Sequence, residues 1–177
     1  MILILADEAK GGAGERLYGI LRSMRMRTEY LPLADVRVEP CVNCGVCTKK
    51  TPGRCAARDD GDAIYPRIAG ADAVVVVTPV VFGGYSFRTK RVVDKFGIFM
   101  DSRYYIKNGE LVKGGLVGRQ FRYFVLGIGD VDADEAAVFE SIVRETIAIT
   151  RGAGRARTCA APDDEMLRTF AEEVLGA

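Results

Sequence analysis

The chain has 177 residues, a length that suits one domain with a sizeable core. Hydrophobic residues make up 49% of it and charged residues 28%, which excludes wholesale disorder. The net charge is +1, with Lys and Arg scattered along the chain, so we expect neither nucleic acid nor a membrane surface as a partner.

The chain opens with an apolar run, Ile2 to Ala6, that Asp7 and Glu8 end at once. The run is too short for a membrane helix and lacks a basic flank, so it predicts a buried strand in a cytoplasmic protein. Apolar residues at helical spacing predict a helix over 17–24. A weaker strand over 28–33 contains a proline, which favours an edge position.

The middle of the chain continues this alternation. A short helix is expected after Asp59-Asp60. Residues 73–78 are β-branched and apolar throughout, as in a central parallel strand that helices cover on both faces. Ser86 is predicted to cap a helix over 89–96. Asn108-Gly109 predicts a small hairpin insertion near 104–112, which we interpret as a flap or an oligomer contact.

The last part of the chain repeats the alternation, with a strand over 121–128, a helix over 136–147, a strand over 155–160 and a helix from Pro162. Strand and helix thus alternate about five times, which predicts an α/β fold with a doubly wound, five-stranded parallel sheet. We expect residues 1–177 to form a single domain with a cysteine-rich loop at 41–60.

Ligands of such sheets bind beyond the carboxyl ends of the strands, near the point where the strand order reverses. The segments expected there are 7–14, 41–60, 78–86 and 127–132. The third of these is apolar, stiffened by Pro79 and opened by Gly83-Gly84. It suits the side of a flat ring, although Pro and Gly also occur in ordinary strand-to-helix turns.

Four cysteines, Cys41, Cys44, Cys47 and Cys55, lie within fifteen positions. Their two-residue gaps let successive thiolates face one centre, which suits an iron–sulfur cluster or a four-thiolate zinc site. Thiols without any metal are the other interpretation. The chain has no His, which excludes His-containing zinc sites and imidazole triads. Cys159 is expected to be a small buried hydrophobe.

Several stretches follow one pattern along the chain: Cys41-Val42-Asn43-Cys44-Gly45-Val46-Cys47, Thr51-Pro52-Gly53-Arg54-Cys55, Asp59-Asp60, Ala71-Asp72, Thr78-Pro79-Val80-Val81-Phe82-Gly83, Lys90 and Asp94. The pattern resembles the NADPH-dependent FMN reductase family and is closest to its iron–sulfur flavoprotein branch. The resemblance implies a flavodoxin-like fold that binds FMN and assembles as a homodimer or tetramer. It also implies electron transfer from NAD(P)H or a protein donor to a small-molecule or protein acceptor.

By the same resemblance, the isoalloxazine ring would contact Pro79, Val80, Val81, Phe82 and Gly83. Gly127, Gly129 and Asp130 would form a neighbouring loop on the flavin. The four clustered cysteines would hold a [4Fe–4S] cluster. From the residues themselves, we expect Asp130 to cap the helix that begins nearby and Lys90 to pair with Asp94.

The loop after the first strand departs from the family. Relatives usually carry hydroxyl side chains there, whereas this loop has none. Asp7, Glu8 and Glu15 would repel a phosphate unless they point away. We therefore expect the anion to be held by backbone amides and basic side chains, namely Lys10, Gly11, Gly12, Gly14 and Arg16.

Two other functions are compatible with parts of the sequence. A non-catalytic interaction protein would use the four cysteines for structural zinc beside a decayed flavin site. A phosphotransfer receiver would use Asp7-Glu8 for Mg²⁺, but the Asp that it needs after the third strand is replaced by Thr78-Pro79.

Overall fold

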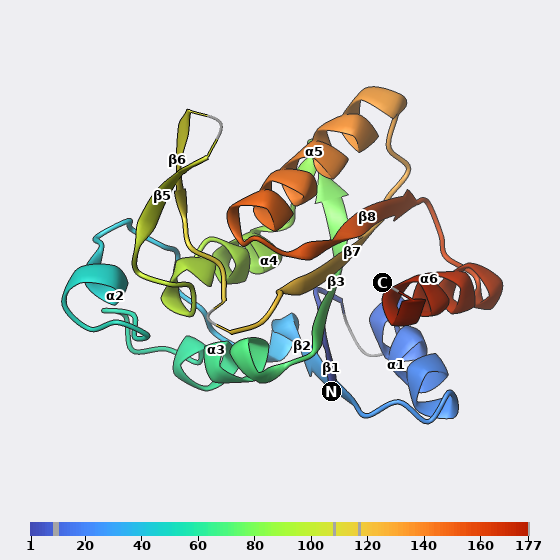
Figure 1. Cartoon of the computed structure of the whole chain (residues 1–177). Coiled ribbons are helices and arrows are strands. Elements are labelled where there is room, and N and C mark those ends of the chain that lie inside the picture. The colour runs from blue at the N-terminus through green and yellow to red at the C-terminus, as the bar shows by residue number, and fades with distance from the viewer. Residues whose placement is uncertain (9–10, 108, 117, 177) are drawn as a thin grey trace.

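The fold is built on a parallel sheet with the strand order β2-β1-β3-β7-β8 (Figure 1). This computed structural model describes residues 1–8, 11–107, 109–116 and 118–176. The strands are β1 (Ile2–Ala6), β2 (Thr28–Pro32), β3 (Ala73–Val81), β7 (Arg122–Ile128) and β8 (Ala153–Cys159). Each neighbouring pair is parallel. The predicted doubly wound sheet is confirmed, with the Pro-containing strand at an edge and 73–81 at the centre.

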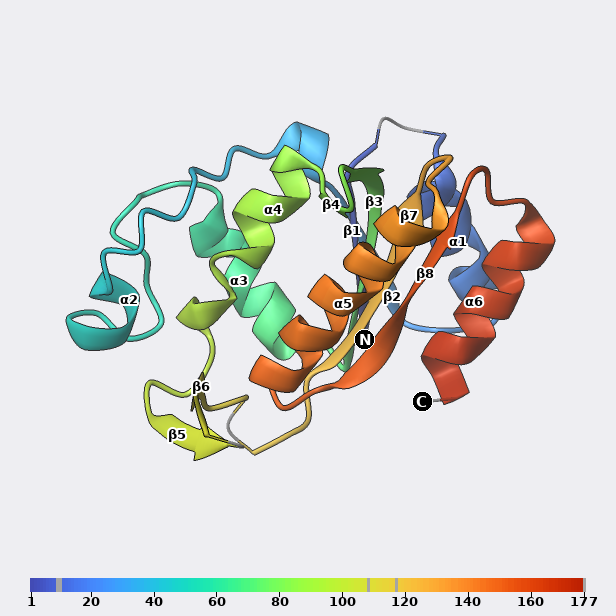
Figure 2. The ribbon, with the colours of Figure 1, turned by 90° about the horizontal axis from the view of Figure 1, so that it is seen from above.

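Helices cover both faces of the sheet (Figure 2). One core forms between the sheet and α1 (Ala13–Ser23) and α6 (Asp164–Gly176). The other forms against α3 (Gly61–Gly70), α4 (Phe87–Val93) and α5 (Ala133–Ile149). Successive strand residues point to opposite faces, so Val74 and Val76 enter one core and Val75 and Val77 the other. This explains why the central strand is apolar at every position from Ala73 to Val77.

Short polar side chains define where the helices begin. The Ser86 side chain accepts a hydrogen bond from the Thr89 amide, which confirms the predicted cap of α4. At α5 the cap is Asp132, whose carboxylate accepts from the Glu135 amide at 2.8 Å. The prediction that Asp130 caps this helix was therefore wrong. Asp130 lies two residues too early to reach the amides of the first turn.

The helix predicted over 89–96 ends earlier, at Val93, and is followed by the 3-10 turn η2 (Phe96–Ile98). Between them Lys95 turns into the protein, where its side chain is 1% exposed. A lysine gives no sequence signal for burial, which is why the apolar spacing of Val92 and Phe96 predicted a continuous helix.

Further short elements lie outside the main sheet. The predicted hairpin forms from β5 (Tyr104–Lys107) and β6 (Glu110–Lys113), and Figure 1 shows it projecting beside α5. Asn108 of its turn lies outside the described residues. The elements not predicted are η1 (Leu33–Asp35), α2 (Val46–Lys49) and β4 (Gly84–Tyr85). Within the described part of the chain, no helix combines the length and apolar character needed to cross a bilayer.

Candidate functional site

The carboxyl ends of β1, β3 and β7 meet at one edge of the sheet. Ala6 is in register with Val77, and the next residue, Thr78, is in register with Gly127. Three of the four segments expected at this edge therefore converge there. The cysteine-rich segment forms a separate pocket, described below.

The buried side chain of Asp7 links two segments at this edge through hydrogen bonds. Its side chain is 2% exposed and accepts hydrogen bonds from the Ser86 hydroxyl and, at 3.2 Å, from Arg88. The Ser86 amide also donates to the Thr78 hydroxyl at 3.4 Å. Asp7 thus fastens the end of β1 to the start of α4 and points away from the loop that follows β1. This structural role leaves Asp7 without a free carboxylate for a receiver-type metal site.

β3 continues past the sheet edge and folds back on itself. Val81 pairs with Gly84 in an antiparallel hairpin whose turn is Phe82-Gly83. Both turn residues have positive φ, +49° at Phe82 and +68° at Gly83, as a two-residue hairpin turn of the I′ kind requires. The turn packs against α5, because a Cβ on Gly83 would lie 3.0 Å from Val138. The sequence predicted a loop here rather than a hairpin.

Phe82 is the most exposed large hydrophobic residue described, at 96%. A non-glycine residue in the left-handed region costs about 1–2 kcal/mol. The turn therefore keeps an aromatic ring in water on a strained backbone, which neither packing nor local propensity explains. Strain and exposure of this kind concentrate at ligand sites.

The loop after β7 lies beside this turn. Val80 and Phe139 fill the space over Gly127, and Gly129 bonds through its amide to the Cys159 carbonyl at 3.0 Å. Asp130 follows as an exposed residue. The predicted ring-contact residues 79–83 and the loop 127–130 are thus brought together. Cys159 is half-buried against the core, and burial raises the pKa of its thiol.

The loop after β1 holds a carboxylate where an anion was expected. Glu8 accepts hydrogen bonds from the amides of Ala13, at 2.9 Å, and of Gly14. Glu15 accepts from the Gly11 amide at 2.6 Å. Arg16 turns away from the loop and bonds to Asp164 and to the Pro162 carbonyl of the α6 side. Lys10 lies outside the described residues.

The glycines of this loop make room for Glu8. A Cβ on Gly12 would lie 2.3 Å from the Glu8 carboxyl carbon. Burial raises the pKa of Glu8, and the nearby charge of Asp7 adds to this, against the lowering effect of the amides. Sequence reasoning placed Glu8 among the repelling charges but did not predict that it would occupy the cradle. As they stand, these residues hold a carboxylate and do not fit the phosphate of FMN, whereas the sheet edge presents the exposed apolar side chains of Val81 and Phe82.

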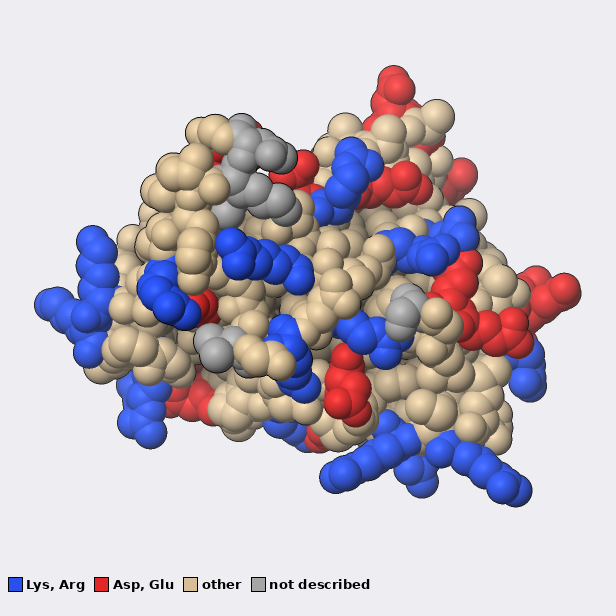
Figure 3. Space-filling model, viewed as in Figure 1, with Lys and Arg blue, Asp and Glu red and all other residues tan. Residues whose placement is uncertain are grey.

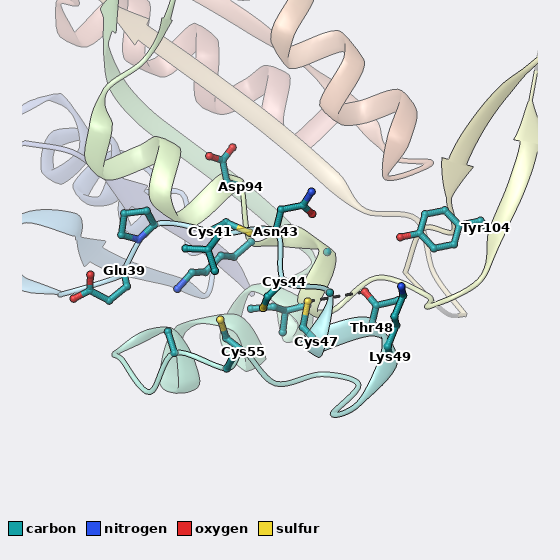
Figure 4. A pocket seen from close by; sticks show the side chains of 18 residues that line it. Glu39, Cys41, Asn43, Cys44, Cys47, Thr48, Lys49, Cys55, Asp94 and Tyr104 are labelled. Carbon is teal, nitrogen blue, oxygen red and sulfur yellow. Dashed lines mark hydrogen bonds between the residues drawn. The ribbon is translucent and has the colours of Figure 1, made fainter.

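The four clustered cysteines line a second site, a pocket of about 390 Å³ beside α2 and η2 (Figure 4). Cys41 and Cys44 are exposed, and Cys47 and Cys55 are half-buried. Figure 4 shows their side chains distributed around the pocket, with Cys47 within 3.9 Å of the Thr48 hydroxyl. Asn43 and Gly45 adopt positive φ, +51° and +69°, which turns the chain sharply between the cysteines.

This arrangement does not focus the thiols on one point. Among the described residues, no three His, Cys, Asp or Glu side chains approach closely enough to hold a single metal ion. Four thiolates are the donor set of a [4Fe–4S] cluster and also of a four-thiolate zinc site. The donor set fits the cluster in its chemistry.

A profile of the family described as NADPH-dependent FMN reductase matches residues 3–114. The match includes β1 from Leu3 onward, the cysteine-rich loop and the β3–β4 turn. The chain belongs to the NADPH-dependent FMN reductase family.

Individual relatives agree with this family. The chain is 37% identical over 70 residues to an iron-sulfur flavoprotein of Methanocaldococcus jannaschii, a match that covers 40% of the chain and 35% of that protein. It is 25% identical over 130 residues to an iron-sulfur flavoprotein of Archaeoglobus fulgidus, with 72% and 63% covered. The chain thus spans less than two thirds of the length of these curated relatives.

Solved structures share the fold. An azoreductase from Bacillus anthracis superposes with a TM-score of 0.61 at 12% identity, over 99% of this chain and 96% of its own. A flavodoxin from Streptococcus pneumoniae gives 0.57 at 14% identity, over 99% and 97%. The flavodoxin-like fold expected from the sequence is confirmed.

In this member of the FMN reductase family, a buried ion pair closes the cysteine-rich loop. The Lys95 ammonium lies 2.7 Å from the Asp59 carboxylate, and the side chains are 1% and 4% exposed. Asp59 also accepts from the amides of Glu39, at 2.9 Å, and Gly61, at 2.8 Å. The Asp59 carboxylate therefore contacts the residues before and after the loop and holds its two ends together. Burial acts to raise the pKa of Asp59, but Lys95 and the amides outweigh it and hold that pKa below its usual value.

We predict that Asp59→Asn lowers the free energy of unfolding by about 3–5 kcal/mol, because it leaves the Lys95 charge buried without a counter-ion. The wild-type stabilisation should be complete above the pKa of an unfolded Asp, about 4, and should decline as the pH falls further. Urea unfolding at pH 7 and pH 3.5 measures both effects.

Asp94→Asn is the matched control. It breaks the Lys90–Asp94 pair, which is confirmed as predicted but lies on the surface of α4, and it should cost less than about 0.5 kcal/mol. Equal losses in the two variants would show that the Asp59 pair does not hold the loop.

Proposed function

We propose that the chain is a flavin-dependent oxidoreductase that accepts electrons from NAD(P)H or a protein donor. The observation that carries this proposal is the strained, exposed Phe82 at the carboxyl edge of the sheet. Family membership supports the same reading. In this proposal the edge binds the isoalloxazine ring of FMN, and the electrons pass to a small-molecule or protein acceptor.

A bound flavin supplies the redox chemistry, so a site without His is no obstacle. The contribution of the chain is to hold and orient the ring. Val81 and Phe82 offer exposed apolar and aromatic surface at this edge, and Val80 packs over Gly127 behind them. The Gly129 amide is bonded to the Cys159 carbonyl, which attaches the neighbouring loop to the end of β8.

We also propose that the four-cysteine pocket holds a [4Fe–4S] cluster. The two iron-sulfur flavoproteins compared above support this through their names and their identity with this chain. Figure 3 shows basic side chains at the left, on the side where Figure 1 places α2. Lys49, Lys50 and Arg54 of the cysteine-rich loop are exposed. Their charge favours the negative charge that four thiolates bring to a cluster.

We further propose that the protein works as a homo-oligomer. The β5–β6 hairpin exposes three large apolar side chains, Tyr104, Ile106 and Leu111, at 54%, 72% and 67%. Ile106 and Leu111 are cross-strand partners, so they present one apolar face. Light scattering should give the mass of a dimer or tetramer, and Ile106→Glu should lower it; a monomeric wild type would contradict this proposal.

The ring site is tested with Phe82→Ala. Loss of the aromatic contact should weaken FMN binding by about 3- to 10-fold, measured by quenching of flavin fluorescence. The free energy of unfolding should not fall, because the side chain is exposed and its backbone is strained. Phe87→Ala removes an exposed aromatic from the first turn of α4, outside the predicted ring contacts, and should leave FMN affinity unchanged. Equal affinity in wild type and Phe82→Ala would mean that the ring does not lie at this turn.

The cluster is tested by anaerobic purification, with iron, zinc, FMN and absorbance quantified per chain. Wild type should carry iron and a broad visible absorbance, and Cys44→Ser should lose both while it keeps FMN. Cys159→Ser, outside the pocket, should keep both. Zinc without iron would instead support the structural four-thiolate site, and unchanged iron in Cys44→Ser would contradict the proposed ligand set.

A further inference from the structure

The phosphate end of the proposed flavin site contains its own negative group. The first amides of α1 point into the loop after β1, as they do wherever a helix binds an anion. In this chain the amides of Ala13 and Gly14 donate to Glu8, and the Gly11 amide donates to Glu15. No donor of this set is left for an incoming phosphate.

The surroundings of Glu8 are negative as well. Asp7 precedes it, Glu15 lies on the first turn of α1, and Tyr30 of β2 packs beside Gly14, whose Cβ position is 3.4 Å from the tyrosine ring. Burial raises the pKa of Tyr30, and the charges of Glu8, Glu15 and Asp35 raise it further. Arg16, the basic residue of this segment that the structure describes, donates hydrogen bonds to the Asp164 carboxylate and the Pro162 carbonyl.

A second observation marks this place as more than a helix cap. The Tyr30 hydroxyl is buried and has no hydrogen-bond partner among the described residues. A buried hydroxyl without a partner is costly, so the packing of Tyr30 beside Gly14 leaves one polar group unsatisfied.

We propose that Glu8 occupies the phosphate position of the flavin site, so that this chain selects against the flavin phosphate. The inference rests on the proposed flavin function and refines it. Because the described residues of the loop offer the phosphate neither a counter-charge nor free amides of this set, binding depends on the ring and ribityl chain, and riboflavin and FMN bind with similar affinity. Phosphate entry requires Glu8 to leave the amides of α1.

The test compares the dissociation constants of riboflavin and FMN for wild type, Glu8→Ala and Glu8→Gln. Wild type should bind both within about threefold of each other. Glu8→Ala frees two amides and removes one negative charge, and should tighten FMN binding about tenfold or more with riboflavin unchanged. Glu8→Gln keeps the side-chain shape and should give a smaller change of the same sign.

Two controls separate the causes. Asp35→Asn removes a charge near Tyr30 but contacts none of the amides of α1, so it should leave the ratio of the two affinities unchanged. Inorganic phosphate should compete with FMN, and not with riboflavin, in Glu8→Ala only. Unchanged riboflavin affinity in each variant shows that the fold and the ring site are intact.

The outcomes distinguish this inference from the function on which it rests. A wild type that strongly prefers FMN, or a ratio that Glu8→Ala does not move, overturns the role of Glu8 as phosphate substitute and leaves it as a helix cap, while flavin binding stands. A protein that binds neither flavin, in wild type and in every variant, overturns the proposed function and this inference with it.

Discussion

The arrangement of the cysteine-rich loop depends on one buried ion pair, Asp59 with Lys95. A charge in the protein interior is tolerated only when it is paired and hydrogen-bonded, so these two side chains fix each other. Asp59 also accepts hydrogen bonds from the amides of Glu39 and Gly61, which lie on either side of the loop. The cysteines are thus carried on a segment whose two ends meet at a single carboxylate, and their relative positions follow from it.

Asp7 is a second buried carboxylate, and it fastens two segments together at the sheet edge. Helix α4 lies between the contacts of Asp7 and those of Asp59. Asp7 holds Ser86 at the start of this helix, and Asp59 holds Lys95 just beyond its end. At 1.5 Å per residue, the seven residues of α4 span about 10 Å. The proposed ring site and the cysteine pocket therefore lie at opposite ends of one short rigid element. A change at either buried carboxylate would alter the spacing between them.

The sequence was sufficient for features that depend on local pattern. Apolar runs and helical spacing predicted the five strands and the main helices. The cysteine spacing predicted one metal centre, and the structure shows that the four cysteines line one pocket. Contacts between distant residues were not predictable. Asp59 and Lys95 are 36 positions apart, and nothing local marks a lysine for burial. The Phe82-Gly83 turn was also missed, because a phenylalanine with positive φ runs against backbone preference and has no compositional signal.

In the Gly-rich loop, the hydrogen bonds from the first amides of α1 to Glu8 stabilise the helix and also limit the binding of anionic ligands. A carboxylate on the first amides of α1 stabilises that helix by satisfying donors that otherwise have no partner. The same carboxylate competes with any anionic ligand for those donors. If the phosphate contributes little, ring contacts at Val80 and Phe82 must supply most of the affinity. Affinity differences between related complexes lie mostly in the dissociation rate, so a flavin held in this way exchanges readily.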